Sequence, residues 1–428
     1  MALTLNQDPN STFPFRPANN PIEYLVNSTN STEPNFKLNT KIYYDVLGAN
    51  TLLATIKKPI EYGTTKCIVD ISNIVRVKEI ETYPYFLASG TVSTLTELKL
   101  IGVSFQEYYG TTPAVSGSVV SGTTFPIFQG AFRYNNFFDN NWIKYVMILG
   151  QNKQFLSSYE NFADRSVFDP ITTFNTISAA TPFKTVRYSE SLYLCAVTYQ
   201  VTGAITMNVA LYDSSYTLLD SQRLSTAAVT GEPYRVDWNL KPSGLEANYG
   251  FSSGDVAVAK YMAVFMNIPT DFAVSKEFYF EIDDCTNAKY GVTYELQWLN
   301  RTGGWDSYIF TGKSKKRTIA DKKFLKNDIT RRISGTTIVN DSYARRKKQF
   351  ETDVTEEFTI REGNMSSIDY NGLEDLFTSP NVFWNDSGTW RSVNVLDSTF
   401  ESKTNKIDRV KDIELVFEVD MDNTLQGW

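Results

Sequence analysis

Histidine is absent from the 428 residues of this chain. The usual general base, the commonest metal ligand and the one side chain that ordinarily titrates between about pH 5 and 8 are therefore missing. Catalysis by Ser-His-Asp or Cys-His groups is excluded. Paired carboxylates, lysine and tyrosine remain for an enzyme, but the sequence singles out no such group. We expect a protein that is not an enzyme and that uses no cofactor.

Cysteine is also scarce, because only Cys67, Cys195 and Cys285 are present, far apart and outside any CxxC pair. Neither a disulfide framework nor a zinc site is indicated. Asp283 and Asp284 are adjacent carboxylates that point to opposite faces if they end a strand, which favours an Asx turn over a shared site. A calcium site there stays open, although no DxDxDG loop supports it. We therefore predict no metal site.

Long apolar runs are missing as well. No window approaches the roughly eighteen apolar residues of a membrane-spanning helix. The N-terminus, "MALTLNQDPNSTFPFRPANNPIEYLV", has neither the basic nor the apolar region of a secretory leader. We expect no membrane partner, and the N-x-S/T triplets are interpreted as ordinary turn residues.

Aromatic residues are abundant, at 14% with 28 Phe and 25 Tyr, which favours strands over helices. The predicted fold is mainly β, with two β-sandwich or jelly-roll-like domains in series and a C-terminal α+β domain with one short helix. Residues 1–110 are a Pro- and Asn-rich arm with a small sandwich, in which residues 66–80 are predicted to be a strand. Residues 111–124 are a Gly/Ser/Thr-rich linker or long loop, and residues 125–312 are a central sandwich.

The third domain, residues 313–428, contains the predicted helix at about 366–378, which Ser366 or Ser367 can cap and Pro380 ends.

Two half-buried strand patterns are clear in the central part of the chain. Ile205, Met207, Val209 and Leu211 alternate with polar or small residues. The stretch "YELQWLNRTGGWDSYIF", residues 294–310, likewise alternates before a Gly-Gly turn and predicts a hairpin.

Positive charge gathers directly after this hairpin. Residues 313–348 hold thirteen Lys and Arg and three Asp, a formal charge of +10. Because the net charge of the chain is −7, the other residues together carry −17. Such separation indicates two oppositely charged surfaces that meet, as in head-to-tail contact between subunits. Contact with passing DNA and a solvated surface are the alternatives. The predicted contact residues are Lys315, Lys316, Arg317, Lys322, Lys323, Arg331, Arg332, Arg345, Arg346, Lys347 and Lys348.

Several stretches carry a resemblance to a known class of proteins. They are "LTLNQDPNSTFPFRPANNPIEYLV", "NKQFLSSYENF", "LQWLNRTGGWDSYIFTG", "LEDLFTSPNVFW", "SVNVLDSTFESK" and "DIELVFEVDMDN". Together they resemble virion structural proteins of tailed phages that infect Bacteroidetes, including crAss-like podoviruses. The resemblance implies a tail or neck component, a ring or hub protein below the portal, and no active-site residues.

We therefore predict a virion structural protein that is assembled in the host cytoplasm. It would form a ring with copies of itself, on the order of six or twelve, contact portal and tail proteins, and build part of the DNA-ejection conduit. The alternative is a receptor- or carbohydrate-binding adhesin, in which exposed Trp384 or Trp390 would stack on sugar. A carbohydrate depolymerase with two carboxylates is a further rival, but no pair can be named.

Overall fold

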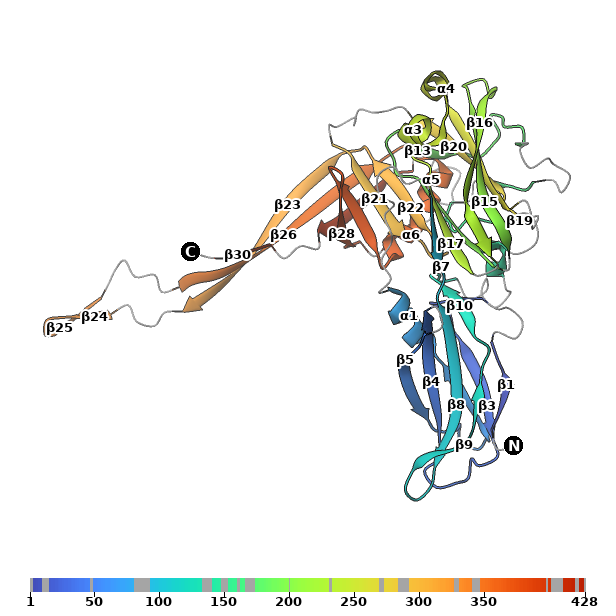
Figure 1. Cartoon of the computed structure of the whole chain (residues 1–428). Helices are drawn as coiled ribbons and strands as arrows, with labels where there is room; N and C mark the ends of the chain where they lie inside the picture. Colours follow the sequence, from blue (N-terminus) through green and yellow to red (C-terminus); the bar gives the residue numbers. More distant parts are fainter. Residues whose placement is uncertain are drawn as a thin grey trace. The chain divides into compact units, whose positions relative to one another are not determined.

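The computed structural model describes residues 3–9, 15–46, 49–80, 93–132, 141–147, 153–159, 162–165, 174–199, 201–230, 233–268, 273–283, 292–326, 331–340, 347–397, 399–401, 411–419 and 423–426 (Figure 1). The chain is mainly β, with 55% strand and 11% helix, which confirms the predicted fold class. Two compact units divide it. Unit 1 comprises Met1–Asp284 and Leu299–Ser307, and unit 2 comprises Cys285–Trp298 and Tyr308–Trp428. The three predicted domain boundaries stay a prediction.

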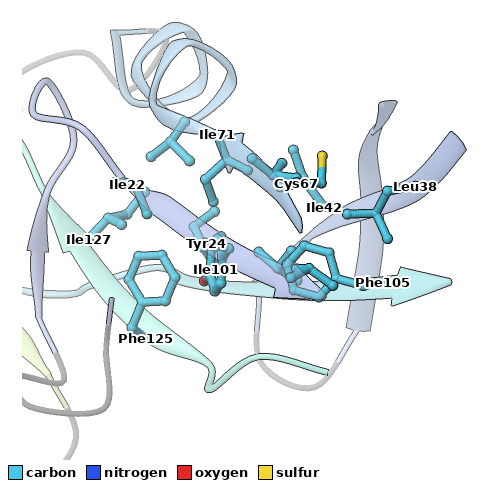
Figure 2. Close-up of a cluster of buried hydrophobic side chains, with 14 of the residues drawn as sticks. Ile22, Tyr24, Leu38, Ile42, Cys67, Ile71, Ile101, Phe105, Phe125 and Ile127 are labelled. Atoms are coloured by element: carbon cyan, nitrogen blue, oxygen red, sulfur yellow. The ribbon is translucent and has the colours of Figure 1, made fainter. Parts of the chain in front are cut away.

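Two sheets and one shared core form the N-terminal part of unit 1. The first sheet has the order β1 (Leu3–Gln7), β3 (Glu23–Ser28), β6 (Lys66–Asp70). The second has the order β2 (Arg16–Pro17), β10 (Phe125–Phe128), β8 (Leu100–Tyr109), β4 (Lys37–Val46), β5 (Ala49–Lys58). Their inward side chains, including Tyr24, Ile42 and Phe105, form one apolar cluster (Figure 2). Alternating burial along β8 is what such a core requires.

A strand lies where the linker was predicted. Strand β9 (Ala114–Ser121) pairs antiparallel with β8, so residues 111–124 are not a linker. Its side chains are mostly exposed, and for that reason its sequence has no apolar alternation. The backbone pairing with β8 decides its structure.

Residues 66–80 were also predicted wrongly as one strand. The strand β6 ends at Asp70, and helix α1 (Ser72–Ile80) follows. The Asp70 carboxylate accepts a hydrogen bond from the backbone N–H of Ser72, 2.9 Å away, and Ile71 and Val75 point into the core at helical spacing. The β-branched residues of this stretch thus serve the face of a helix.

The central part of unit 1 holds two further sheets. One has the order β11 (Val146–Met147), β14 (Tyr193–Thr198), β17 (Tyr234–Asn239), β7 (Ser93–Glu97). The other has the order β12 (Phe162–Ala163), β20 (Glu277–Asp283), β18 (Tyr261–Ile268), β15 (Thr202–Tyr212), β16 (Leu218–Thr230), with β13 (Lys184–Arg187) beside β20 and β19 (Ala273–Val274) beside β18. The short helices here are η1 (Asn141–Tyr145), η2 (Pro242–Gly244), α3 (Leu245–Tyr249) and α4 (Ser253–Val258).

The predicted alternation in β15 is present, but both of its faces are buried. Thr206 and Asn208, expected on a solvent face, are 1% and 2% exposed. The Asn208 side-chain amide donates to the Asn267 side-chain oxygen at 3.0 Å, and the Thr206 hydroxyl donates to the Asn267 carbonyl oxygen at 3.1 Å. Hydrogen bonds between polar partners therefore allow this strand to be covered on both sides.

The predicted hairpin at 294–310 exists as β21 (Tyr294–Leu299) and β22 (Trp305–Phe310). Its tip, Leu299–Ser307, belongs to unit 1. The Asp306 carboxylate there accepts hydrogen bonds from the Ser157 hydroxyl, the Ser158 N–H and hydroxyl, and the Asn300 amide, at 2.7 to 2.9 Å. This buried network fixes the tip among residues that precede it by about 150 positions in the chain.

Close backbone approach explains the Gly-Gly pair of this tip. A Cβ atom on Gly303 would lie 1.4 Å from the Gln129 carbonyl oxygen, and one on Gly304 would lie 1.7 Å from that of Leu156. The φ angle of Gly303 is +94°, a backbone conformation that residues with a side chain rarely adopt. The two glycines are therefore required by contacts within unit 1 as well as by the turn.

Unit 2 is built on one eight-stranded sheet. Its order is β22, β21, β27 (Val382–Asp386), β28 (Thr389–Val395), β29 (Ile413–Val419), β26 (Lys347–Glu362), β23 (Ser314–Lys326), with β30 (Asn423–Gln426) beside β26. Strands β24 (Arg331–Ser334) and β25 (Thr337–Asn340) form a separate hairpin. Every residue of β21 is buried, so the predicted half-buried pattern is wrong for Glu295 and Gln297. The Asn385 amide donates to the Glu295 carboxylate at 2.6 Å.

The predicted helix of this unit is present in two pieces, α5 (Ser367–Gly372) and α6 (Glu374–Thr378). Ser366 is the N-cap, because its hydroxyl accepts a hydrogen bond from the N–H of Asp369 at 3.0 Å. Leu373, fully buried, stands between the two pieces. The boundaries and the apolar face thus agree with the sequence pattern, while the interruption at Leu373 was not predicted.

Candidate assembly ribbon of unit 2

The basic segment folds as one half of a long two-stranded ribbon. Strands β23 and β26 pair antiparallel from Ser314 opposite Ile360 to Lys326 opposite Lys347 (Figure 1). Thirteen residues of β23, at about 3.3 Å each, make the ribbon about 40 Å long. Every side chain described from Lys313 to Phe324 is exposed except the partly buried Ile319. Such a surface is unusual for a strand and defines the candidate site.

The ribbon has two parts with different neighbours. We call residues 314–321 and 353–360 the root, and residues 322–326 and 347–352 the distal part. In the root, β26 also pairs with β29 over Glu357–Glu362, so the root is continuous with the large sheet. Farther out, β26 pairs with β30 over Glu351–Val354. Among the strands that the structure describes, β23 has no partner along its second edge.

Aromatic packing holds the root in the sheet. Phe358 of β26 stacks on Phe417 of β29 with ring centres 5.3 Å apart, and Trp384 of β27 lies 5.0 Å from Phe358. Tyr294 of β21 completes the cluster at 6.0 Å from Phe358. The ring contacts between strands that are not adjacent in the sheet show that the sheet curls around this cluster. The root is therefore anchored by a buried core.

Backbone contacts also fix the start of the ribbon. The buried Glu362 carboxylate accepts hydrogen bonds from the N–H groups of Thr311 and Gly312 at 2.5 and 3.2 Å. A Cβ atom on Gly312 would lie 1.8 Å from the Arg361 carbonyl oxygen, so only glycine fits there. These contacts join the chain before β23 to the end of β26.

Two of the predicted contact residues form ion pairs within the root. The Lys316 ammonium lies 2.7 Å from the Glu356 carboxylate and 5.4 Å from the centre of the Phe358 ring. The Arg317 guanidinium lies 3.6 Å from the Glu357 carboxylate. The acidic residues of "ETDVTEEF", residues 351–358, thus compensate part of the positive charge of residues 313–348. A basic run followed by an acidic run of similar length could have signalled this hairpin.

The distal part lacks such compensation at several positions. Lys322 lies opposite Thr352, and Lys326 lies opposite Lys347, a like-charge register that is unfavourable in an isolated hairpin. No ion pair joins Lys315, Lys322 or Lys347 to a side chain that the structure describes. Positive charge is therefore concentrated toward the far end of the ribbon.

Most of the other predicted contact residues lie in the same ribbon or in the hairpin of β24 and β25. Lys323 is exposed and lies opposite Glu351 at the bulge of the ribbon. Arg331 and Arg332 are in β24, and Lys348 is in β26 opposite Leu325. Arg345 and Arg346 lie outside the described residues. The structure thus brings most of the predicted residues into two hairpins of one unit.

A polar cleft beside the root was not predicted. It has a volume of about 510 Å³ and is lined by Thr311–Lys313, residues 361–364 and residues 412–414. Arg361 and Glu414 form an ion pair at 2.5 Å on its wall, and the Asp412 carboxylate accepts from the N–H of Asn364 at 3.3 Å. These contacts of Glu414 and Asp412 hold the loops that line the cleft.

Several buried charges in unit 1 are also paired. In unit 1 the Lys184 ammonium contacts the Glu190 carboxylate at 2.8 Å, and Arg165 contacts Glu277. Burial, with the nearby Asp237 carboxylate, raises the pKa of Cys195 well above its usual value, so this thiol is a poor nucleophile. These groups hold the fold together and do not form a catalytic constellation.

Asp283, one of the two carboxylates considered for an Asx turn or a calcium site, lies within the described residues. Asp283 ends β20 and forms an ion pair with Arg187, while Asp284 lies outside the described residues. Within the described ranges, no group of three or more Asp, Glu and Cys side chains is placed to hold a metal ion.

The tryptophans named for sugar binding are differently placed. Trp384 packs against Tyr294 and Phe417 in the aromatic cluster, with ring centres 5.8 and 5.9 Å apart. Trp390 of β28 lies opposite Asn385 and is partly buried. Trp384 thus contributes to the aromatic core of unit 2, and the sugar-binding alternative stays a prediction.

Comparison of the sequence with known protein families gives no match, and comparison with curated proteins gives none either. In the part of the chain that the structure describes, no helix has the length and apolar composition needed to cross a membrane.

Proposed function

We propose that this chain is a structural subunit of a tailed-phage virion, a tail or neck ring or hub protein that oligomerises near the portal and forms part of the DNA-ejection conduit. The ribbon is the observation that carries this proposal. Strand β23, about 40 Å long, adds little to the core of its own unit, because its described side chains are exposed apart from the partly buried Ile319. Its anchored root and charged surface suit contact with a neighbouring subunit.

The mainly β units support the same proposal. Buried hairpins with both faces covered and glycines fixed by backbone contacts make stiff building elements. The resemblance of several sequence stretches to virion proteins of Bacteroidetes-infecting phages supplies the biological setting. Portal and tail proteins are the proposed partners, with passing DNA as a further contact of positive side chains.

The test is a variant with a shortened ribbon. Because Ala320 lies opposite Val354, residues 321–353 can be replaced by Asn-Gly, a pair that closes such hairpins. We expect the variant to fold and to be missing from particles when it replaces the normal protein in an infection. Peptide mass mapping of purified particles and circular dichroism of the isolated variant measure the two outcomes.

Two results would contradict the proposal. Absence of the normal protein from purified particles would remove the virion role. Incorporation of the shortened variant at normal copy number would show that the ribbon is not used in assembly.

A further inference from the structure

The charge of the ribbon is divided along its length. In the root, Lys316 and Arg317 are paired with Glu356 and Glu357 on the opposite strand. Residues 322–348, beyond the root, hold nine Lys and Arg against two Asp, a formal charge of +7. The lysines at the last register positions, 326 and 347, lie directly opposite each other. Repulsion between such neighbours is relieved when an anionic surface covers them.

The complementary charge lies in the same unit. Residues 349–428 hold seventeen Asp and Glu against six Lys and Arg, a formal charge of −11. The acidic side chains described as exposed in this range are Glu401, Asp412 and Glu414, of which Asp412 also accepts from the N–H of Asn364 and Glu414 pairs with Arg361. A second copy of this chain therefore carries excess charge of the sign that the distal part lacks, with Glu401 exposed.

The free edge of β23 restricts how two copies can meet. Edge-to-edge pairing of two β23 strands would place Lys and Arg of one copy beside those of the other, which is unfavourable. A contact that uses the same patch on both copies is thus disfavoured. A basic patch of one copy on an acidic patch of the next is a heterologous contact, the kind that builds rings.

We propose that the distal part of the ribbon, around Lys322 and Lys347, docks on exposed carboxylates of unit 2 in a second copy, Glu401 among them, and that the root takes no part in this contact. The inference rests on the proposed assembly role and names its partner. Duplex DNA is the rival polyanion. A single strand is less well matched, because Phe324, 50% exposed, is the one large aromatic side chain described as exposed on the ribbon, and the stacking platforms of single-strand binders use several.

The experiment compares two variants of the full-length protein with equal charge change. The double variant Lys322→Glu/Lys347→Glu reverses two distal charges, and the control Lys313→Glu/Lys315→Glu reverses two exposed charges, one directly before the root and one within it. Sedimentation velocity at low salt measures self-association. We expect the distal variant to weaken it by at least about tenfold, and the control to stay within about twofold of the unaltered protein. Added salt should weaken association of the unaltered protein in the same way.

A second measurement identifies the acceptor. Copies of normal and heavy-nitrogen isotope composition are mixed and treated with a carbodiimide, which joins an amine to a carboxylate in direct contact. We expect peptides that link Lys322 or Lys347 of one isotope to Asp or Glu of residues 349–428 of the other. Links confined to a single isotope, or equal effects of the two double variants, would overturn the proposal.

DNA binding is the third readout. A fluorescent duplex is titrated with all three proteins. If the unaltered protein stays monomeric at every concentration and the distal variant alone loses duplex binding, the surface belongs to DNA and the self-contact is refuted. Detection of the protein in particles would, in that case, leave the virion role standing while this partner assignment fails.

Discussion

At the scale of single residues, the hairpin tip of unit 1 depends on the absence of side chains. Gly303 and Gly388 have the same φ angle of +94°, but only Gly303 has a backbone oxygen where a Cβ atom would lie. The two positions therefore separate the effect of strained backbone from the effect of steric overlap.

We expect Gly303→Ala to lower the free energy of unfolding by at least about 3 kcal/mol, because the Gln129 backbone must move. The matched change Gly388→Ala has open space around it and should cost about 1–2 kcal/mol for the backbone conformation alone. Urea denaturation followed by tryptophan fluorescence measures both. Equal losses would show that the tip is not held as closely as the structure indicates.

Single residues were predicted correctly from the sequence where a side chain contacts residues close to it in the chain. Ser366 was one of two named caps, and its hydroxyl does cap α5. The fixed partners of Gly303 and Asp306 could not be predicted, because they come from residues near 129 and 157, far away in the sequence. Local patterns carry no information about such contacts.

At the scale of elements, the ribbon is anchored by its aromatic core and only weakly by its ion pairs. The side chains of Lys316 and Glu356 are 50% and 31% exposed, so solvent screens their attraction. Phe358 is 5% exposed and contacts three other rings.

Accordingly, Lys316→Ala should change the free energy of unfolding of unit 2 by less than about 1 kcal/mol. Phe358→Ala removes a buried ring and should cost about 3–5 kcal/mol. Thermal unfolding in low and high salt distinguishes the contributions, because only the ion pair is sensitive to salt. A large loss from Lys316→Ala that salt abolishes would contradict this assignment.

Element types were predicted well where burial follows the strand period, as in β8, and poorly where other forces decide. Four of the nine residues of α1 are Val or Ile, yet a capping carboxylate and a helical apolar face make this segment a helix. Strand β9 is polar, yet pairing with β8 makes it a strand. The charged run at 313–348 was recognised as the candidate site, but its pairing with the acids of β26 needed the three-dimensional register.

At the scale of the whole molecule, several buried tyrosines connect stability to high pH. Burial, followed by the nearby Glu277 carboxylate, raises the pKa values of Tyr212 and Tyr279 well above the ordinary value. A hydrogen bond with Tyr216 is the main cause that raises the pKa of Tyr261 to about 12. All of these groups belong to unit 1.

The sign of the effect follows from proton binding. Above the ordinary tyrosine pKa of about 10 the unfolded chain loses protons that the folded chain keeps, so unfolding becomes favoured. We expect the free energy of unfolding of unit 1 to be insensitive to these groups below pH 10 and to fall between about pH 10 and 12. Urea titrations across this range, followed by fluorescence, measure the decline.

The change Tyr212→Phe supplies the control, because it removes one buried hydroxyl from the titration. The variant should lose stability less steeply above pH 10, by up to about 1.4 kcal/mol per pH unit relative to the unaltered protein. Identical slopes for the two proteins would show that Tyr212 ionises as readily in the folded state as in the unfolded chain.

The late position of the hairpin tip in the chain also determines when the fold of unit 1 can be completed during synthesis. Its partners near residues 129, 157 and 190 leave the ribosome long before Leu299–Ser307, which supplies Asp306 and Ser307. Nascent chains that end at residue 284 would thus have a vacant place where the tip belongs, and a recombinant fragment cut there should be handled as an unfinished product.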